Sequence, residues 1–140
     1  MAVGETLRRL TGKALAKTAV AGFKTHFEPI QLGVGTSGGC EATVHTARQW
    51  LARNRDSKSK VLVTLDLENA FNCVDRSAFL REARRMAPNL VPWLDYCYKT
   101  DGNLLLGQHR LRSARGIQQG DPLGPALFAL SVHELSLIHI

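Results

Sequence analysis

Helical periodicity dominates the pattern of hydrophobic and polar positions along this chain. It predicts helices over residues 5–23, 40–54, 76–86 and 92–98, and a last helix that starts at Pro122 or Leu123 and ends near Leu130. Proline suits the first turn of a helix, which supports the starts near Pro92 and Pro122. Asp75 stands where its side chain can cap the helix over residues 76–86.

The first three of these helices each carry an apolar face. Its members are Leu7, Leu10, Ala14 and Ala21 in the first helix; Val44, Ala47, Trp50 and Leu51 in the second; and Phe79, Leu80, Ala83 and Met86 in the third. We expect the faces of the second and third helices to be buried. Another face of the first helix carries Arg9, Lys13 and Lys17, four residues apart. Such a stripe is usually a solvated surface, and less often a surface that faces phosphates.

Two segments predict extended structure. Residues 60–65 are a short, mostly apolar run, which is typical of a strand buried on both faces. Residues 104–112 predict a hairpin with its turn at Gly107 and Gln108. Residues 24–39 contain a proline and several glycines, and we expect them to form a loop. The pattern therefore indicates a helix-rich chain with a small antiparallel sheet.

Composition fits one modest domain or a piece of a larger one, because the chain has 140 residues and a hydrophobic content of 44%. Residues 1–60 hold ten Lys and Arg against four Asp and Glu, whereas residues 61–140 hold eight against eight. A basic front half suggests a polyanionic partner such as nucleic acid, although a soluble basic surface explains the charge about equally well.

The cysteines and the hydropathy pattern bear on location. The three cysteines lack metal-ligand spacing and fit reduced thiols better than a disulfide framework. The sequence shows no apolar stretch typical of a signal peptide or long enough to span a membrane. We therefore expect an intracellular protein, in the cytoplasm or nucleus, with no membrane partner.

The first candidate for chemistry is Asp66, which directly follows the predicted strand. Nucleotidyl transfer uses two magnesium ions, and magnesium prefers hard oxygen ligands. A strand would hold the Asp66 carboxylate firmly, and the following turn could present the Leu67 carbonyl as a second oxygen. For an isolated aspartate, the commoner role is to cap the next turn.

A second set of candidates surrounds the turn before the last helix. Gln119 and Gly120 precede Asp121-Pro122, so they form a polar loop at a helix start that could touch a nucleotide or a template base. An ordinary entry from a loop into a helix is about equally consistent with the pattern. Phe71 follows Asp66 by five residues, and its ring could exclude a ribose 2′ hydroxyl by contact. A core phenylalanine is the commoner alternative.

Residues 33–38 match Gly-x-Gly-x-x-Gly and precede a predicted helix, a pattern typical of dinucleotide-binding folds. The stretch before Gly33 contains a proline and is too short for the first strand of such a fold. Asp66 also comes later than the ribose-binding acid of that pattern, which stands about 20 residues after the glycines. The dinucleotide interpretation is therefore weak, and no Lys-Ser/Thr pair completes a P-loop.

Taken together, residues 65–72 and 115–128 resemble the first and second palm motifs of the reverse transcriptase domain of non-LTR retrotransposons. The two motifs occur in the family's order and at roughly its separation. Gln31 and Gly33, followed by a helix, resemble the family's fingers segment. The resemblance covers residues 2–134.

This resemblance implies an α+β fold made of the fingers and part of the palm of a right-hand polymerase. Residues 1–59 would be fingers-like, and residues 60–134 would be palm. It also implies two-metal, RNA-directed DNA synthesis with Mg²⁺, in which an RNA template, a DNA primer and dNTPs are the partners.

The resemblance also assigns roles to residues. Asp66 would be a catalytic metal ligand together with the Leu67 carbonyl. Phe71 would be the sugar gate, and Gln119 and Gly120 would contact the incoming nucleotide and the template. The family's third motif is a turn with an Asp-Asp pair, and no Asp-Asp occurs in the chain. The chain is therefore predicted to be inactive as written.

Both ends of the sequence carry further expectations. The family's Arg-Pro-Ile segment would end at Met1, so we expect the basic residue that reaches the triphosphate to be missing. Residues 135–140 match a translated sequencing adapter, with a genuine apolar tail as the alternative. Two functions follow: a partial reverse transcriptase domain, or a non-catalytic module that binds nucleic acid through its basic front half.

Overall fold

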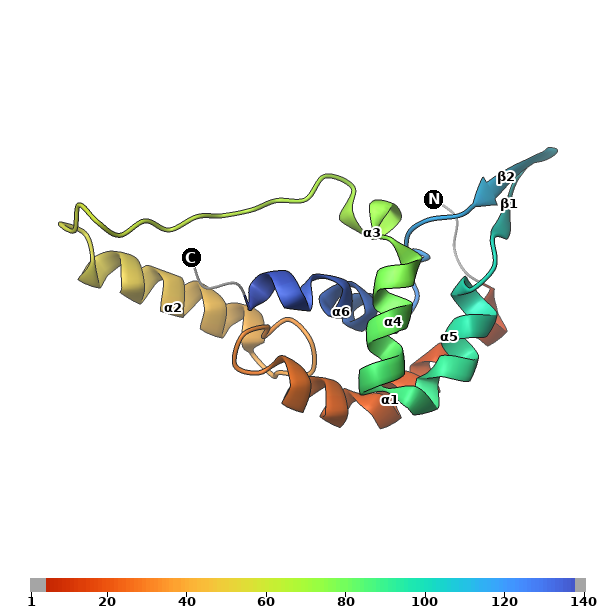
Figure 1. Ribbon diagram of the computed structural model, residues 1–140, viewed down its shortest axis with the longest axis horizontal. Helices are drawn as coiled ribbons and strands as arrows, with labels where there is room; N and C mark the ends of the chain where they lie inside the picture. The colour runs from red at the N-terminus through yellow and green to blue at the C-terminus, as the bar shows by residue number, and fades with distance from the viewer. Residues whose placement is uncertain (1–4, 138–140) are drawn as a thin grey trace.

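Figure 1 shows the computed structural model of the chain, which describes residues 5–137. In chain order its elements are α1 (Thr6–Phe27), α2 (Gly39–Arg53), α3 (Ala70–Cys73), α4 (Arg76–Met86), the 3-10 helix η1 (Pro88–Leu90), α5 (Val91–Tyr98), β1 (Gly102–Leu106), β2 (His109–Ser113) and α6 (Gly124–Ser136). All five predicted helices and the hairpin are confirmed, with α1 and α6 ending later than expected. The helix-rich α+β fold is confirmed as well.

Helices α1, α4, α5 and α6 enclose the hydrophobic core. Its largest fully buried side chains are Phe27, Phe79, Leu94, Leu123, Leu127 and Leu130. Burial of one such side chain stabilises the fold by roughly 1.5–3 kcal/mol. In α4 the expected burial of Phe79, Leu80 and Ala83 is confirmed, whereas Met86 is 41% exposed. Met86 is the last residue of α4, where the helix reaches the surface.

The buried side of α1 differs from the apolar face seen in the sequence. Leu7 and Leu10 are 69% and 64% exposed, and both alanines of that face are exposed too. Gly12, Phe23 and Phe27 are buried instead. The two phenylalanine rings stack with centroids 5.9 Å apart, and their large apolar area sets the rotation of the helix.

Helix α2 leaves the bundle as an arm, as Figure 1 shows at the left. The expected burial of its apolar face is wrong for Val44 and Leu51, which are each 48% exposed. Ala47 and Trp50 are half-buried. The cause is that the arm projects from the core, so its apolar side has little of the chain to cover it.

The glycine-rich loop before α2 packs on α1. A Cβ atom on Gly35 would lie 3.2 Å from the Val20 carbonyl oxygen and 3.1 Å from the Lys24 Cβ atom. Residues 5–32 contain no strand. The loop therefore lacks the strand that a dinucleotide-binding fold places before its glycines, and Gly35 serves close packing on α1.

The predicted buried strand over residues 60–65 is wrong. Residues 61–67 are extended but unpaired, and they run back from the far end of α2 toward α3 (Figure 1). Val61 and Leu65 are 79% and 87% exposed. A strand requires a neighbour that exchanges backbone hydrogen bonds, and the strands described in residues 5–137, β1 and β2, pair with each other.

The β1–β2 hairpin pairs Gly102 with Ser113 and Leu106 with His109, and Gly107 turns the chain with a φ of 59°. Helix α6 continues through residues 135 and 136 of the predicted adapter tail, whereas residues 138–140 lie outside the described part of the chain. Met1 and the segment through Gly4 also lie outside it. Within residues 5–137, none of the helices combines the length and hydropathy needed to cross a membrane.

Candidate nucleotide and nucleic-acid site

The two sequence motifs meet through backbone hydrogen bonds between α3 and the loop before α6. The Ile117 N–H donates to the Phe71 carbonyl at 2.7 Å, and the Gly116 N–H donates to the Val74 carbonyl at 2.9 Å. The Gln119 side-chain amide also donates to Asn72 Oδ1 at 3.5 Å. The structure therefore brings the segments that carry Phe71 and Gln119 together across more than forty residues of sequence.

This approach depends on Gly116. Its φ is +75°, a region that side chains disfavour, and a Cβ atom there would lie 2.4 Å from the carbonyl oxygen of Asn72. No flexible side chain is involved, so the contact could not relax without moving the backbone. Gly116 is thus the residue that lets the two segments lie against each other.

Phe71 is half-buried and packs against α6. Its ring stacks on Phe128 with centroids 5.2 Å apart and an interplanar angle of 16°. A Cβ atom on Gly124 would lie 3.4 Å from the ring, so α6 starts directly beside it. The ring therefore has a structural contact on one side, which agrees in part with the core interpretation of this residue.

Asp66 and Leu67 lie outside this cluster. Both are exposed and belong to the extended segment between α2 and α3. They do not line the cavity beside Gln119, which is described below. Gly120 is exposed with a φ of +81°, next to the Arg9 side chain, whereas Gln119 is half-buried. Of the predicted site residues, the fold brings Phe71, Gln119 and Gly120 to one region and leaves the metal candidates apart from it.

A polar network behind the loop fixes its conformation. The Tyr98 hydroxyl donates to Asp121 Oδ2 and accepts from the Gln118 N–H at 3.3 Å. Asp121 Oδ1 accepts from the Leu123 N–H at 2.9 Å, which closes an Asx turn just before α6. Burial and then the neighbouring Asp121 carboxylate raise the pKa of Tyr98 well above its usual value, so the phenol stays a donor.

Two arginines lie over the Tyr98 ring. The guanidinium carbon of Arg8 is 5.1 Å from the ring centroid, and that of Arg76 is 5.5 Å away. Arg8 Nη2 is 4.0 Å from Asp121 Oδ2. Arg8 thus ties the start of α1 to the loop before α6.

The Arg76 side chain holds the loop through hydrogen bonds to backbone carbonyl oxygens. It donates to the carbonyl oxygens of Ser113, Gly116 and Arg115 at 2.7, 2.9 and 3.1 Å, and to the Ser113 hydroxyl at 2.9 Å. Partial burial lowers the pKa of Arg76, yet an arginine stays charged in proteins. The side chain therefore joins the end of β2 to the loop with four hydrogen bonds, and none of the described carboxylates pairs with it.

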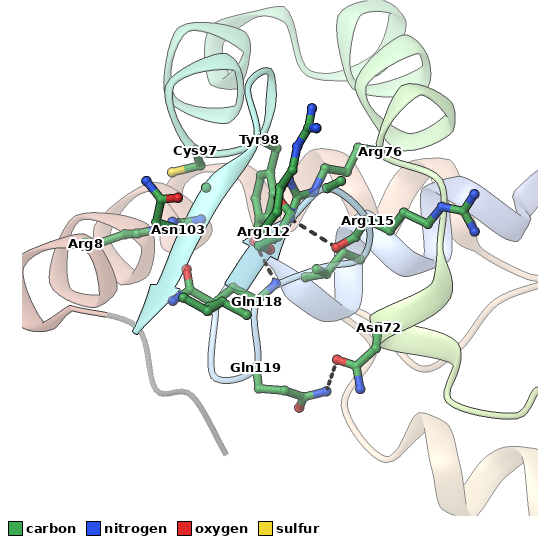
Figure 2. A pocket seen from close by; sticks show the side chains of 15 residues that line it. Arg8, Asn72, Arg76, Cys97, Tyr98, Asn103, Arg112, Arg115, Gln118 and Gln119 are labelled. Carbon is green, nitrogen blue, oxygen red and sulfur yellow. Dashed lines mark hydrogen bonds between the residues drawn. The ribbon is translucent and has the colours of Figure 1, made fainter. Parts of the chain in front are cut away.

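A cavity of about 660 Å³ opens beside this network, between α5, the hairpin and the loop. Figure 2 shows Arg8, Tyr98, Gln118 and Gln119 around it, with Asn72 bonded to Gln119 at its edge. Burial also raises the pKa of the Cys97 thiol, which lines the cavity.

Comparison with protein families matches residues 4–138 to reverse transcriptase (RNA-dependent DNA polymerase). The match covers nearly the whole chain. The chain belongs to the reverse transcriptase family. No match was found among curated proteins or among solved structures. The family implies nucleic acid and nucleotides as the substrates of the complete domain.

The described residues of this reverse transcriptase domain do not by themselves form a metal site. Within residues 5–137, no group of three or more His, Cys, Asp or Glu side chains is placed to hold a metal ion. The exposed Asp66 carboxylate forms no hydrogen bond or ion pair with another described residue. It is therefore free to take an external ligand but lacks the neighbouring carboxylates that magnesium requires.

Sequence reasoning missed the roles of Tyr98, Arg8 and Arg76 in the reverse transcriptase domain. Arg8 and Arg76 belong to different helices, and only the fold brings both to Tyr98. Asp121 did carry a signal, because an aspartate favours a turn in which its side chain accepts from the backbone N–H two residues on, as Asp121 does from Leu123.

Proposed function

We propose that this chain supplies the fingers and part of the palm of the reverse transcriptase of a non-LTR retrotransposon. Residues 1–59 would be fingers and residues 60–134 palm. The observation that carries the proposal is the family match over residues 4–138. The junction between residues 71–74 and 116–119 supports it, because the two motifs then act as one unit.

In this proposal Phe71 bounds the sugar of the incoming nucleotide, and Gln119 and Gly120 contact that nucleotide and the template. The positive φ of Gly120 and its exposure leave the backbone open to a ligand. Asp66, with the Leu67 carbonyl, contributes one part of a magnesium site. The remaining carboxylates would come from a segment other than the one described here.

The test is primer extension on an RNA template with Mg²⁺. We expect the chain alone to incorporate no nucleotide, because Asp66 alone cannot hold the metal. We expect template-dependent extension from a longer product of the same gene that adds an Asp-Asp turn after residue 134. Incorporation by the chain alone would contradict the proposed division of the site.

Asp66→Asn in the longer protein is a more specific test of the metal site. It keeps the side-chain volume and removes the charge, so extension should fall to background. Because Asp66 is exposed and bonds to no other described side chain, the free energy of unfolding should change by no more than about 0.5 kcal/mol. Glu68→Gln is the matched control, since Glu68 is another exposed acid on the same segment. Full activity of Asp66→Asn would show that Asp66 is not a metal ligand.

The second candidate is a non-catalytic module that binds nucleic acid. The observation that favours it is the basic stripe of α1, in which Arg9, Lys13 and Lys17 are all exposed. It predicts sequence-independent, salt-sensitive binding that Asp66→Ala leaves unchanged. A longer gene product that binds RNA but never extends a primer would favour this candidate.

A further inference from the structure

Residues 61–67 form an extended segment that has no partner among the described residues. Neither their backbone groups nor their side chains make a hydrogen bond with another described residue. Figure 1 shows the segment apart from the helices, on its way from the far end of α2 to α3. An exposed extended segment presents a row of backbone N–H and C=O groups that a strand of another chain can pair with.

The two faces of this segment differ in chemistry. Successive side chains of an extended chain lie on opposite faces. One face is therefore entirely apolar and consists of Val61, Val63, Leu65 and Leu67. Each of these four residues is more than half exposed. A contiguous apolar surface of this kind marks an interaction site, because its burial against a partner is favourable.

The charges at the two ends of the segment have opposite signs, with Lys60 before it and Glu68 after it. Among the described residues neither has an ion pair, and Lys60 donates to the neutral Asn54 Oδ1 at 2.8 Å. If two copies of the segment lie antiparallel about Thr64, Lys60 of each copy faces Glu68 of the other. Parallel pairing would instead place like charges opposite each other, which is destabilising. Residues 58 and 59 form a bend, so the ladder would begin at Lys60.

The antiparallel register about Thr64 also matches the two faces. Val61 of one copy would lie opposite Leu67 of the other, and Val63 would lie opposite Leu65. The apolar side chains of both copies would therefore form one continuous surface, with cross-strand contacts between them. A shift by one residue would place these side chains opposite polar ones, because a one-residue slip exchanges the two faces of a strand.

We propose that two copies of this chain associate by antiparallel pairing of residues 61–67 about a twofold axis at Thr64. A helix could cover the apolar face, but only a second strand also pairs with the backbone groups. A two-stranded contact this short buries less area than a standard interface, so the association is weak. The proposal goes beyond the proposed function and does not depend on it.

Sedimentation velocity over about 1–200 μM distinguishes monomer from dimer, and we expect the dimer in the upper part of this range. Lys60→Glu and Glu68→Lys each place like charges opposite each other at both ends of the ladder. Both side chains are exposed, so the variants should fold like the parent chain, which thermal melts check. A parent chain that stays monomeric throughout would leave the segment to another partner and would overturn the proposal.

We expect each charge variant alone to dimerise about tenfold more weakly, because two attractive pairs in the dimer become repulsive. An equimolar mixture of Lys60→Glu and Glu68→Lys should dimerise at least as well as the parent chain, since each variant offers the charge that the other lacks. The parent carries a net charge of +6, so both variants stay positive and overall charge cannot attract them to each other. A mixture that dimerises no better than the separate variants would overturn the proposal.

Leu65→Thr tests the apolar face, and Leu105→Thr is the matched control because Leu105 is an exposed leucine of β1. We expect Leu65→Thr to weaken dimerisation about fivefold, whereas Leu105→Thr should stay within about twofold of the parent chain. If Leu105→Thr alone weakens the dimer, the hairpin is the contact and the proposal is wrong. Equal weakening in both variants would indicate non-specific apolar association, which would also overturn it. None of these measurements needs polymerase activity.

Discussion

Tyr98, at the end of α5, donates a hydrogen bond from its hydroxyl to the carboxylate of Asp121, at the entry into α6. The Asp121 side chain is only 6% exposed, and Tyr98 is buried in the core. One pair of atoms therefore joins the hydrophobic core to the loop that carries Gln119 and Gly120. The position of that loop depends on packing that lies well behind it.

Tyr98→Phe tests this connection. The ring and its arginine contacts remain, while Asp121 Oδ2 loses its donor in a nearly buried place. We expect the free energy of unfolding to fall by about 1–3 kcal/mol, the cost of a buried polar group left without a partner. Urea denaturation measures it.

Tyr96→Phe is the control for the same chemical change. Tyr96 is 78% exposed on the same helix, so its hydroxyl contacts water in both the folded and the unfolded chain. We expect a change within about 0.5 kcal/mol. If Tyr98→Phe were equally mild, the bond to Asp121 would not hold the loop.

Gly116→Ala should be among the most harmful small substitutions in the chain. The added methyl would lie 2.4 Å from the backbone oxygen of Asn72, and the backbone is in the left-handed region. We expect a loss of more than about 2 kcal/mol, because strain and a broken junction add together. Urea denaturation measures this loss.

Gly22→Ala is the same substitution at another site, but we expect it to raise stability. Gly22 lies within α1, and no atom of the described residues outside its local helix lies within 4 Å of an added Cβ atom. Alanine favours a helix interior over glycine by about 0.5–1 kcal/mol, so the variant should gain stability. A thermal melt that ranks Gly22→Ala below the parent chain would contradict this account of α1.

The sequence predicted the helices well because their period and caps are local. The conformation of residues 60–65 depends on distant parts of the chain. The apolar run has the composition of a strand, but a strand needs a neighbouring strand, and none of the described residues pairs with it. The same limit applied to the site. Phe71 and Gln119 carry motif signals in the sequence, whereas Tyr98 and Arg8 acquire their roles only when α5 and α1 pack together.

Asp75→Ala tests a local prediction at the start of α4. The Asp75 carboxylate accepts from the Ser77 N–H at 2.8 Å, and this hydrogen bond lowers the pKa of Asp75. Loss of a helix cap costs about 1 kcal/mol, measurable by urea denaturation at neutral pH. Asp75→Asn keeps an acceptor and should lose far less. An equal loss in both variants would mean that the hydrogen bond from the Ser77 N–H is not the source of the stability.

The pH dependence of stability should show a contribution from His26. Burial, then the neighbouring His133, lowers the pKa of His26 below 6.5, with a smaller opposing effect of Glu82 and a further lowering by Arg85. The unfolded chain then takes up a proton more readily, so stability is full above pH 6.5 and falls as the pH drops through the folded-state pKa. We expect the thermal midpoint to be lower at about pH 5.5 than at about pH 7.5, and His26→Gln to reduce that difference. His45→Gln, on the exposed arm, should leave this difference in thermal midpoint unchanged. An equal reduction in both variants would show that His26 is not the source of the pH dependence.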